Sequence, residues 1–155
     1  MGKVCAKAIW AIACCASATT LTEAHEHKAP HKGTLIVLAD EFAHLELVLD
    51  GKAGKLTAYV LDGEAERFVR IQQKQIDLRL SLEDKEGKKE VLVSLKAVAN
   101  VLTGETEGNT SQFEGEAAAL KDVKRFAGVV AALAVKGSEF KDVQFRYPEG
   151  NEGGR

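Results

Sequence analysis

The four histidines of this sequence all fall between positions 25 and 44, and they are the side chains most able to do chemistry. Imidazole is the commonest protein ligand for zinc, copper and nickel. In extended chain, residues two apart point the same way, so neighbouring members of this set can share one ion. The pattern predicts an open, exchangeable site for copper or zinc. Its candidate ligands are His25, His27, His31, His44 and Glu46.

The same histidines allow two other interpretations. In one, the histidines of the polar stretch are solvated, and His44 with Glu46 forms the wet face of a strand. In the other, the cluster senses pH, because histidine titrates in the physiological range. A structural zinc site would show a fixed Cys/His spacing, which this sequence lacks. The sequence leaves all three interpretations open.

Other catalytic patterns are missing from the sequence. Nucleophilic catalysis needs a nucleophile, a base and an orienting group, and acid catalysis needs a tuned pair of carboxylates. The chain has no Gly-x-Ser-x-Gly elbow and no phosphate-binding glycine loop after a predicted strand. We therefore expect a protein that is not an enzyme and that holds no cofactor apart from a metal ion.

The charge balance argues against a nucleic-acid partner. The chain has 21 basic and 23 acidic residues, which gives a formal net charge of -2. Binding to nucleic acid relies on a basic surface that releases counterions, and no basic stripe with interleaved aromatic residues occurs here. We expect no nucleic acid among the partners.

Residues 1–18 have the three parts of a signal peptide. Lys3 and Lys7 supply the cationic start, residues 8–15 form a short apolar run, and Ala16-Ser17-Ala18 offers a cleavage site. The run is too short to span a bilayer, which takes about 20 residues. The competing interpretation is an amphipathic or buried first helix. The signal pattern predicts an exported protein, periplasmic or anchored to the membrane by lipid.

Cys14 offers a lipid anchor as an alternative to simple secretion. It follows Ala11-Ile12-Ala13, and this segment looks like a bacterial lipoprotein signal in which the cysteine is lipidated, although leucine is usual at position 11. Cleavage before Cys14 gives an anchored protein and cleavage after Ala18 a soluble one; we favour the anchor. All three cysteines lie in the leader, so the body has no disulfide framework.

The body divides into three parts. We expect a flexible histidine-containing tether over 19–33, a single β domain over 34–147 and a disordered tail over 148–155. Alternating apolar and polar residues predict the strands, and turn residues such as Asp50-Gly51 and Asp62-Gly63 separate them. The predicted strands cover residues 34–39, 42–50, 55–61, 75–83, 89–98, 112–114, 126–135 and 139–147.

The strand pattern points to a mainly β fold. One short helix is predicted over 116–125, where residues 117–120 favour helix. The alanine-rich run 129–135 suits either a strand or a helix. The expected architecture is an antiparallel β-sandwich or barrel-like sheet of about seven to eight strands with one short helix.

Three segments of the first half, residues 31–38, 42–50 and 54–63, resemble a group of small exported bacterial proteins of largely unassigned function. That group has a His-Gly-Gly start, a Tyr-His-x-Glu-like strand and a Tyr-Val-Leu-Asp hairpin. The pattern is also similar to a small β domain of periplasmic adaptor subunits of heavy-metal efflux pumps. With residues 111–120 and the closing hairpin, the resemblance covers most of 30–147. His31, His44 and Glu46 match it, whereas Lys32 stands where glycine is usual.

The resemblance implies an envelope β domain linked to metal handling. Its partner would be an envelope protein or a metal-efflux component. A second function stays open, because exposed sheet edges and a tether also suit a β-sandwich interaction or structural module at the membrane surface with no metal role.

Overall fold

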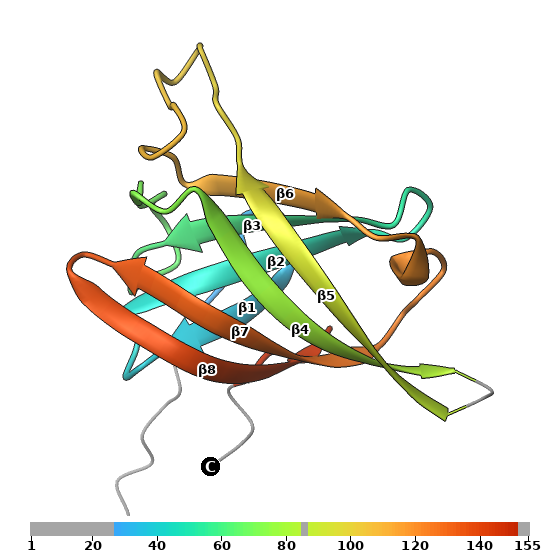
Figure 1. The fold of residues 1–155 in the computed structure, drawn as a ribbon. Helices are drawn as coiled ribbons and strands as arrows, with labels where there is room; N and C mark the ends of the chain where they lie inside the picture. The colour runs from blue at the N-terminus through green and yellow to red at the C-terminus, as the bar shows by residue number, and fades with distance from the viewer. Residues whose placement is uncertain (1–26, 85–86, 152–155) are drawn as a thin grey trace, which may run out of the picture.

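The computed structural model describes residues 27–84 and 87–151, which contain eight antiparallel strands in one sheet (Figure 1). The sheet order is β1-β2-β3-β6-β5-β4-β7-β8, and the sheet curves until β1 lies near β8. The strands are β1 (Thr34–Leu38), β2 (Ala43–Asp50), β3 (Lys55–Leu61), β4 (Gln75–Asp84), β5 (Gly87–Ala97), β6 (Gln112–Glu116), β7 (Phe126–Val135) and β8 (Ser138–Tyr147). This nearly closed barrel confirms the prediction of a mainly β, barrel-like sheet.

Several predictions fall outside the described ranges. The signal peptide, the lipidation residue Cys14 and the candidate ligand His25 all belong to residues 1–26. Within 27–84 and 87–151, no helix is long and apolar enough to cross a membrane.

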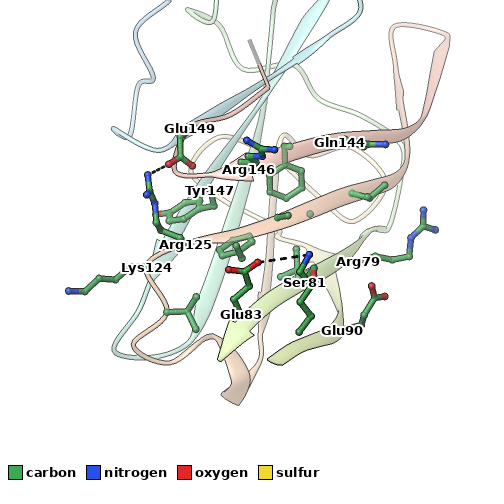
Figure 2. Close-up of a pocket in the computed structure, with 18 of the residues that line it drawn as sticks. Arg79, Ser81, Glu83, Glu90, Lys124, Arg125, Gln144, Arg146, Tyr147 and Glu149 are labelled. Atoms are coloured by element: carbon green, nitrogen blue, oxygen red, sulfur yellow. Dashed lines mark hydrogen bonds and ion pairs between the residues drawn. The ribbon is translucent and has the colours of Figure 1, made fainter. Parts of the chain in front are cut away.

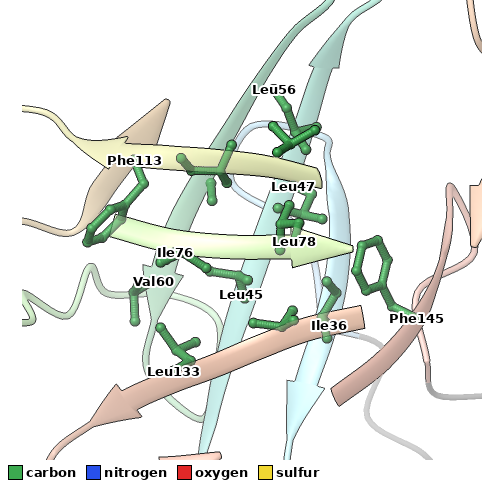
Figure 3. Packing of buried hydrophobic residues seen from close by; sticks show 14 of the residues in the cluster. Ile36, Leu45, Leu47, Leu56, Val60, Ile76, Leu78, Phe113, Leu133 and Phe145 are labelled. Atoms are coloured by element: carbon green, nitrogen blue, oxygen red, sulfur yellow. The ribbon is translucent and has the colours of Figure 1, made fainter. Parts of the chain in front are cut away.

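The core fills the inside of the barrel with apolar residues from every strand (Figure 3). In β4, Ile76, Leu78 and Leu80 are buried, while the alternate side chains face outward, as the sequence pattern predicts. Each fully buried leucine or isoleucine contributes about 1.5–3 kcal/mol relative to its exposed state. The same alternation in β2 directs Leu45 and Leu47 into this core. It therefore turns His44 and Glu46 to the outer face of the sheet.

The alanine-rich run forms strand β7 and not a helix. Its register with β8 runs from Phe126 opposite Tyr147 to Val135 opposite Ser138. The buried positions change phase between Val130 and Leu133, and Asp142 on the facing strand has a positive φ of 50° at this level. An irregularity of this kind obscures the two-residue period in the sequence.

The helix predicted over 116–125 is reduced to a three-residue 3-10 turn, η1 (Ala118–Leu120). Ala117 and Lys121 on either side of it are extended, and the backbone of this segment bonds to the β2–β3 turn. Ala117 N donates to Gly54 O at 2.9 Å and Asp122 N donates to Gly51 O at 2.8 Å. Leu120 remains buried in the core. Long-range bonds therefore overrode the local helix preference of this segment.

The C-terminal segment 148–151 covers the open edge of β1. The side chain of Asn151 accepts a hydrogen bond from Val37 N at 2.8 Å and donates one to Val37 O at 3.0 Å. Gly150 passes so close to β1 that a Cβ atom there would lie 2.3 Å from Leu35 O. Since an uncovered edge is a template for unwanted pairing, this segment protects the barrel where its sheet does not close. The packed chain thus extends past the boundary predicted at residue 147.

Candidate metal site on the outer face of β2

His44 and Glu46 are 0% exposed although they lie on the outer face of β2. They are covered by residues 27–33, which run over this face and contact both side chains. The interpretation that these two residues form a wet strand face is therefore wrong. The covering segment carries two further candidate ligands, His27 and His31, and it brings one of them to each buried residue.

Glu46 is hydrogen-bonded to His31 and Gly33 of the covering segment. We call these three residues the clamp. Glu46 Oε1 accepts hydrogen bonds from the backbone N of His31 at 2.8 Å and of Gly33 at 2.9 Å. Glu46 Oε2 lies 3.0 Å from His31 Nδ1. Both carboxylate oxygens are thus occupied, as a buried carboxylate requires. Both oxygens of Glu46 therefore anchor residues 27–33 to β2.

Packing around the clamp fixes its position. The His31 ring stacks on Tyr59, with ring centroids 3.8 Å apart and an interplanar angle of 13°. Gly33 approaches β2 so closely that a Cβ atom would lie 2.5 Å from Leu47 O, so only glycine fits. Burial raises the pKa of Tyr59, and the nearby carboxylates of Glu114 and Glu46 raise it further. The Tyr59 ring is therefore a neutral platform for His31.

His27 and His44 form a second contact, which we call the histidine pair. Their ring centroids are 4.9 Å apart and the rings are tilted by 58°. The His27 side chain is 7% exposed, and Nε2 of both residues is buried without a hydrogen-bond partner. Nearly all buried polar atoms in proteins have a hydrogen-bond partner, so two such nitrogens on contacting rings are an exception that needs an explanation.

The proton position on His44 follows from its other ring nitrogen. His44 Nδ1 lies 3.1 Å from the backbone oxygen of Asp62, which can only accept a hydrogen bond. Nδ1 therefore carries the hydrogen, and Nε2 of the neutral ring presents a lone pair. Metal-binding histidines commonly donate their second nitrogen to a backbone carbonyl in this way.

The turn that supplies the Asp62 carbonyl is held by its own side chain. Asp62 Oδ1 accepts hydrogen bonds from the backbone N of Glu66 at 3.0 Å and of Arg67 at 3.2 Å. Burial raises the pKa of the Asp62 carboxyl, but these backbone donors, with Lys136 and Arg67 nearby, lower it to below its usual value. The carboxylate stays ionised, and the turn keeps the carbonyl aimed at His44.

The separation of the two ring centroids is close to that of two imidazoles bound to one ion. Imidazoles bound to one ion at about 2.0–2.1 Å, with a tetrahedral angle between them, have ring centres about 5 Å apart. The observed centroid separation is 4.9 Å. Across the described part of the chain, however, no three His, Cys, Asp or Glu side chains already converge as a complete metal site. The tertiary structure thus brings together two of the predicted ligands, and assigns His31 and Glu46 to a separate contact.

One residue near the pair had no signal in the sequence. Glu41, in the turn between β1 and β2, places Oε1 3.6 Å from His27 Nε2, and its side chain is 55% exposed. No spacing rule links position 41 to position 27, because the hairpin and the covering segment together create the contact. Only its place three residues before His44 could have drawn attention to it.

A wide, open hollow lies elsewhere, against β4, β7, β8 and residues 121–125 (Figure 2). Its volume is about 1560 Å³, and it is lined by charges of both signs. Arg125 pairs with Glu149 there, and Phe126 stacks on Tyr147 with ring centroids 4.9 Å apart. It contains no histidine and no constellation of catalytic groups.

Comparisons with models of known protein families, with curated proteins and with solved structures gave no match for this chain.

Proposed function

We propose that this chain is a non-enzymatic, exported envelope protein that binds a divalent transition metal ion, copper or zinc, at the histidine pair. The observation that supports this most directly is the presence of two buried Nε2 atoms without a hydrogen bond, on His27 and His44, whose rings are in contact. A buried polar atom without a partner costs about 1–3 kcal/mol. A shared ion would satisfy both atoms at once. The proposed export rests on the signal pattern of residues 1–18.

The ligand chemistry of the body narrows the choice of ion. Beyond the leader the sequence has neither cysteine nor methionine, so soft sulfur ligands are absent. Imidazole nitrogen suits Zn²⁺, Cu²⁺ and Ni²⁺, and a site with few protein ligands leaves positions for water or for an acceptor's ligands. Such a site suits a protein that buffers an ion or passes it on.

Titration of the full chain with Zn²⁺ and Cu²⁺ tests this function. Isothermal titration calorimetry of the wild type should show binding of one ion, and His27→Gln and His44→Gln should each abolish it. Circular dichroism of the variants checks that they remain folded. Negligible heats from the wild type for both ions would contradict the proposal.

A second candidate function is an interaction module with no metal role. Val101 and Leu102 are 93% and 97% exposed in the loop that joins β5 and β6 and projects from the barrel at the top of Figure 1. Exposed apolar side chains at a loop tip favour contact with another protein. A defined partner recovered from envelope extracts equally well with and without chelator, and lost in a Val101→Ser/Leu102→Ser variant, would support this function.

A further inference from the structure

We infer that Glu41 is the third protein ligand of the ion, which makes the site one for divalent cations in preference to Cu⁺. This inference rests on the proposed function and deepens it, because it names the ligand set as two imidazole nitrogens and one carboxylate oxygen. Three observations carry it: the distance between Glu41 and His27, the backbone of the turn that holds Glu41, and the exposure of its side chain.

The distance between the two groups has the value expected of atoms that share an ion. Glu41 Oε1 and His27 Nε2 are 3.6 Å apart, and Nε2 has no hydrogen bond. A nitrogen and an oxygen that bind one ion at about 2.0–2.2 Å each, with a tetrahedral angle between the bonds, are about 3.3–3.6 Å apart. A direct hydrogen bond would instead bring them within about 3.2 Å. The two groups form an ion pair, and their separation is also the one that an ion bound between them would give.

The backbone of the turn fixes where the carboxylate begins. Ala39 and Glu41 both have positive φ values, 52° and 57°, which residues other than glycine seldom adopt. Glu41 N donates to Ala39 O at 3.0 Å, and Phe42 N donates to Leu38 O at 3.1 Å. Strained residues of this kind cluster at ligand-binding sites, where the surroundings hold them in place.

A close contact with the neighbouring turn holds this conformation. Gly63 lies so near Glu41 that a Cβ atom on Gly63 would be 2.3 Å from Glu41 O. The turn that holds Glu41 therefore packs against a residue that has no side chain. Gly63 follows Asp62, whose carbonyl orients His44. The same turn therefore positions one imidazole ligand and the carboxylate ligand.

The Glu41 side chain is free to change its rotamer. It is 55% exposed, so a change of rotamer meets little resistance and the carboxylate can complete a set that is not yet converged. A carboxylate at the exposed side of two buried imidazoles also gives an ion a route in and out. Its negative charge favours a divalent ion, whereas Cu⁺ prefers soft, uncharged or sulfur ligands.

The test compares Glu41→Gln with Glu64→Gln in the full chain. Glu64 is an exposed glutamate on the neighbouring turn, so its variant controls for the loss of one negative charge at this end of the barrel. Affinities for Zn²⁺ and Cu⁺ are measured by competition with a chromophoric chelator. We expect Glu41→Gln to weaken Zn²⁺ binding about tenfold or more and to change Cu⁺ binding less than about twofold. Glu64→Gln should change neither.

Two results would overturn the inference and leave the proposed function standing. In the first, Glu41→Gln binds Zn²⁺ as tightly as the wild type while His27→Gln does not bind it. In the second, Glu41→Gln weakens Zn²⁺ and Cu⁺ equally. A wild type that binds neither ion would overturn both. Electron paramagnetic resonance of the Cu²⁺ complex gives an independent readout, because replacement of a carboxylate by an amide changes its spectrum when Glu41 is a ligand and leaves it unchanged otherwise.

Discussion

The clamp and the histidine pair lie two residues apart on one face of β2, yet they differ in how their polar atoms are satisfied. In the clamp, both oxygens of Glu46 are bonded to the covering segment. In the pair, His27 of the same segment contacts His44 of the same strand, but Nε2 of each has no hydrogen bond. The hydrogen bonds between the covering segment and β2 thus lie at the clamp, whereas the pair contributes a contact between two rings. The pair is therefore the contact at which we propose that an ion binds.

Removal of the clamp carboxylate should have the largest effect. Glu46→Leu leaves the backbone N–H groups of His31 and Gly33 without their acceptor, so we expect a loss of about 3 kcal/mol or more in the free energy of unfolding. Zn²⁺ binding should weaken as well, because His27 is no longer held beside His44. Urea denaturation and zinc titration measure the two effects.

The matched control for this variant is Glu114→Gln, which removes a half-buried carboxylate from another strand. Glu114 forms an ion pair with Lys55 at 2.7 Å. We expect this variant to cost less than about 1 kcal/mol, because partly exposed ion pairs contribute little. Equal losses from both variants would mean that the clamp has no special role.

Added zinc should stabilise the wild type through the pair. An ion that binds only the folded state at 100 times its dissociation constant raises the free energy of unfolding by about 2.7 kcal/mol. Thermal unfolding with and without Zn²⁺ measures this gain, which should disappear in His27→Gln and His44→Gln. A gain that persists in both variants would place the ion elsewhere.

Leucine substitutions on the covering segment should separate the two contacts in the absence of metal. His31→Leu removes a bonded ring, so we expect it to lower stability by about 1–2 kcal/mol. His27→Leu removes a buried nitrogen that has no hydrogen bond and only an ion pair with the exposed Glu41, so the metal-free protein should be unchanged or more stable by up to about 1 kcal/mol. Chemical denaturation in chelator tests this opposition, and a larger loss from His27→Leu would reverse the assignment of roles.

Glu105 is a second buried carboxylate whose oxygens are hydrogen-bonded. Its substitution should have a smaller effect on stability than that of Glu46, and the effect should depend on pH. Burial raises its pKa, but hydrogen bonds from Ser111 and Thr103, together with Arg70, lower it to below the usual value. Because the folded-state pKa is below the unfolded one, its stabilisation is present above the unfolded pKa and is lost as the pH falls through the folded pKa.

We therefore expect Glu105→Gln to lower stability by about 1 kcal/mol at pH 7 and to match the wild type once the pH falls below both pKa values. Urea denaturation at pH 7 and at about pH 3 measures the difference. A gap of the same size at both pH values would show that ionisation of Glu105 contributes nothing.

The strands were predictable because each one repeats a local pattern. In β4, apolar residues at every second position face the core, so the sequence alone determines the strand and its inward face. The prediction of a helix over 116–125 was wrong for the opposite reason. Local preference favours helix there, but Gly51 and Gly54, more than sixty positions away, take up the backbone hydrogen bonds.

The sequence by itself determined the fold class and the residue types that could bind an ion, since alternation and clustered histidines are local properties. Only the tertiary structure decided how those residues are paired. Residues 27–33 fold back over β2, so His31 meets Glu46 across fifteen positions and His27 meets His44. The hairpin turn then adds Glu41 to the second contact. Such pairings depend on which segment covers which strand face, and no local pattern contains that information.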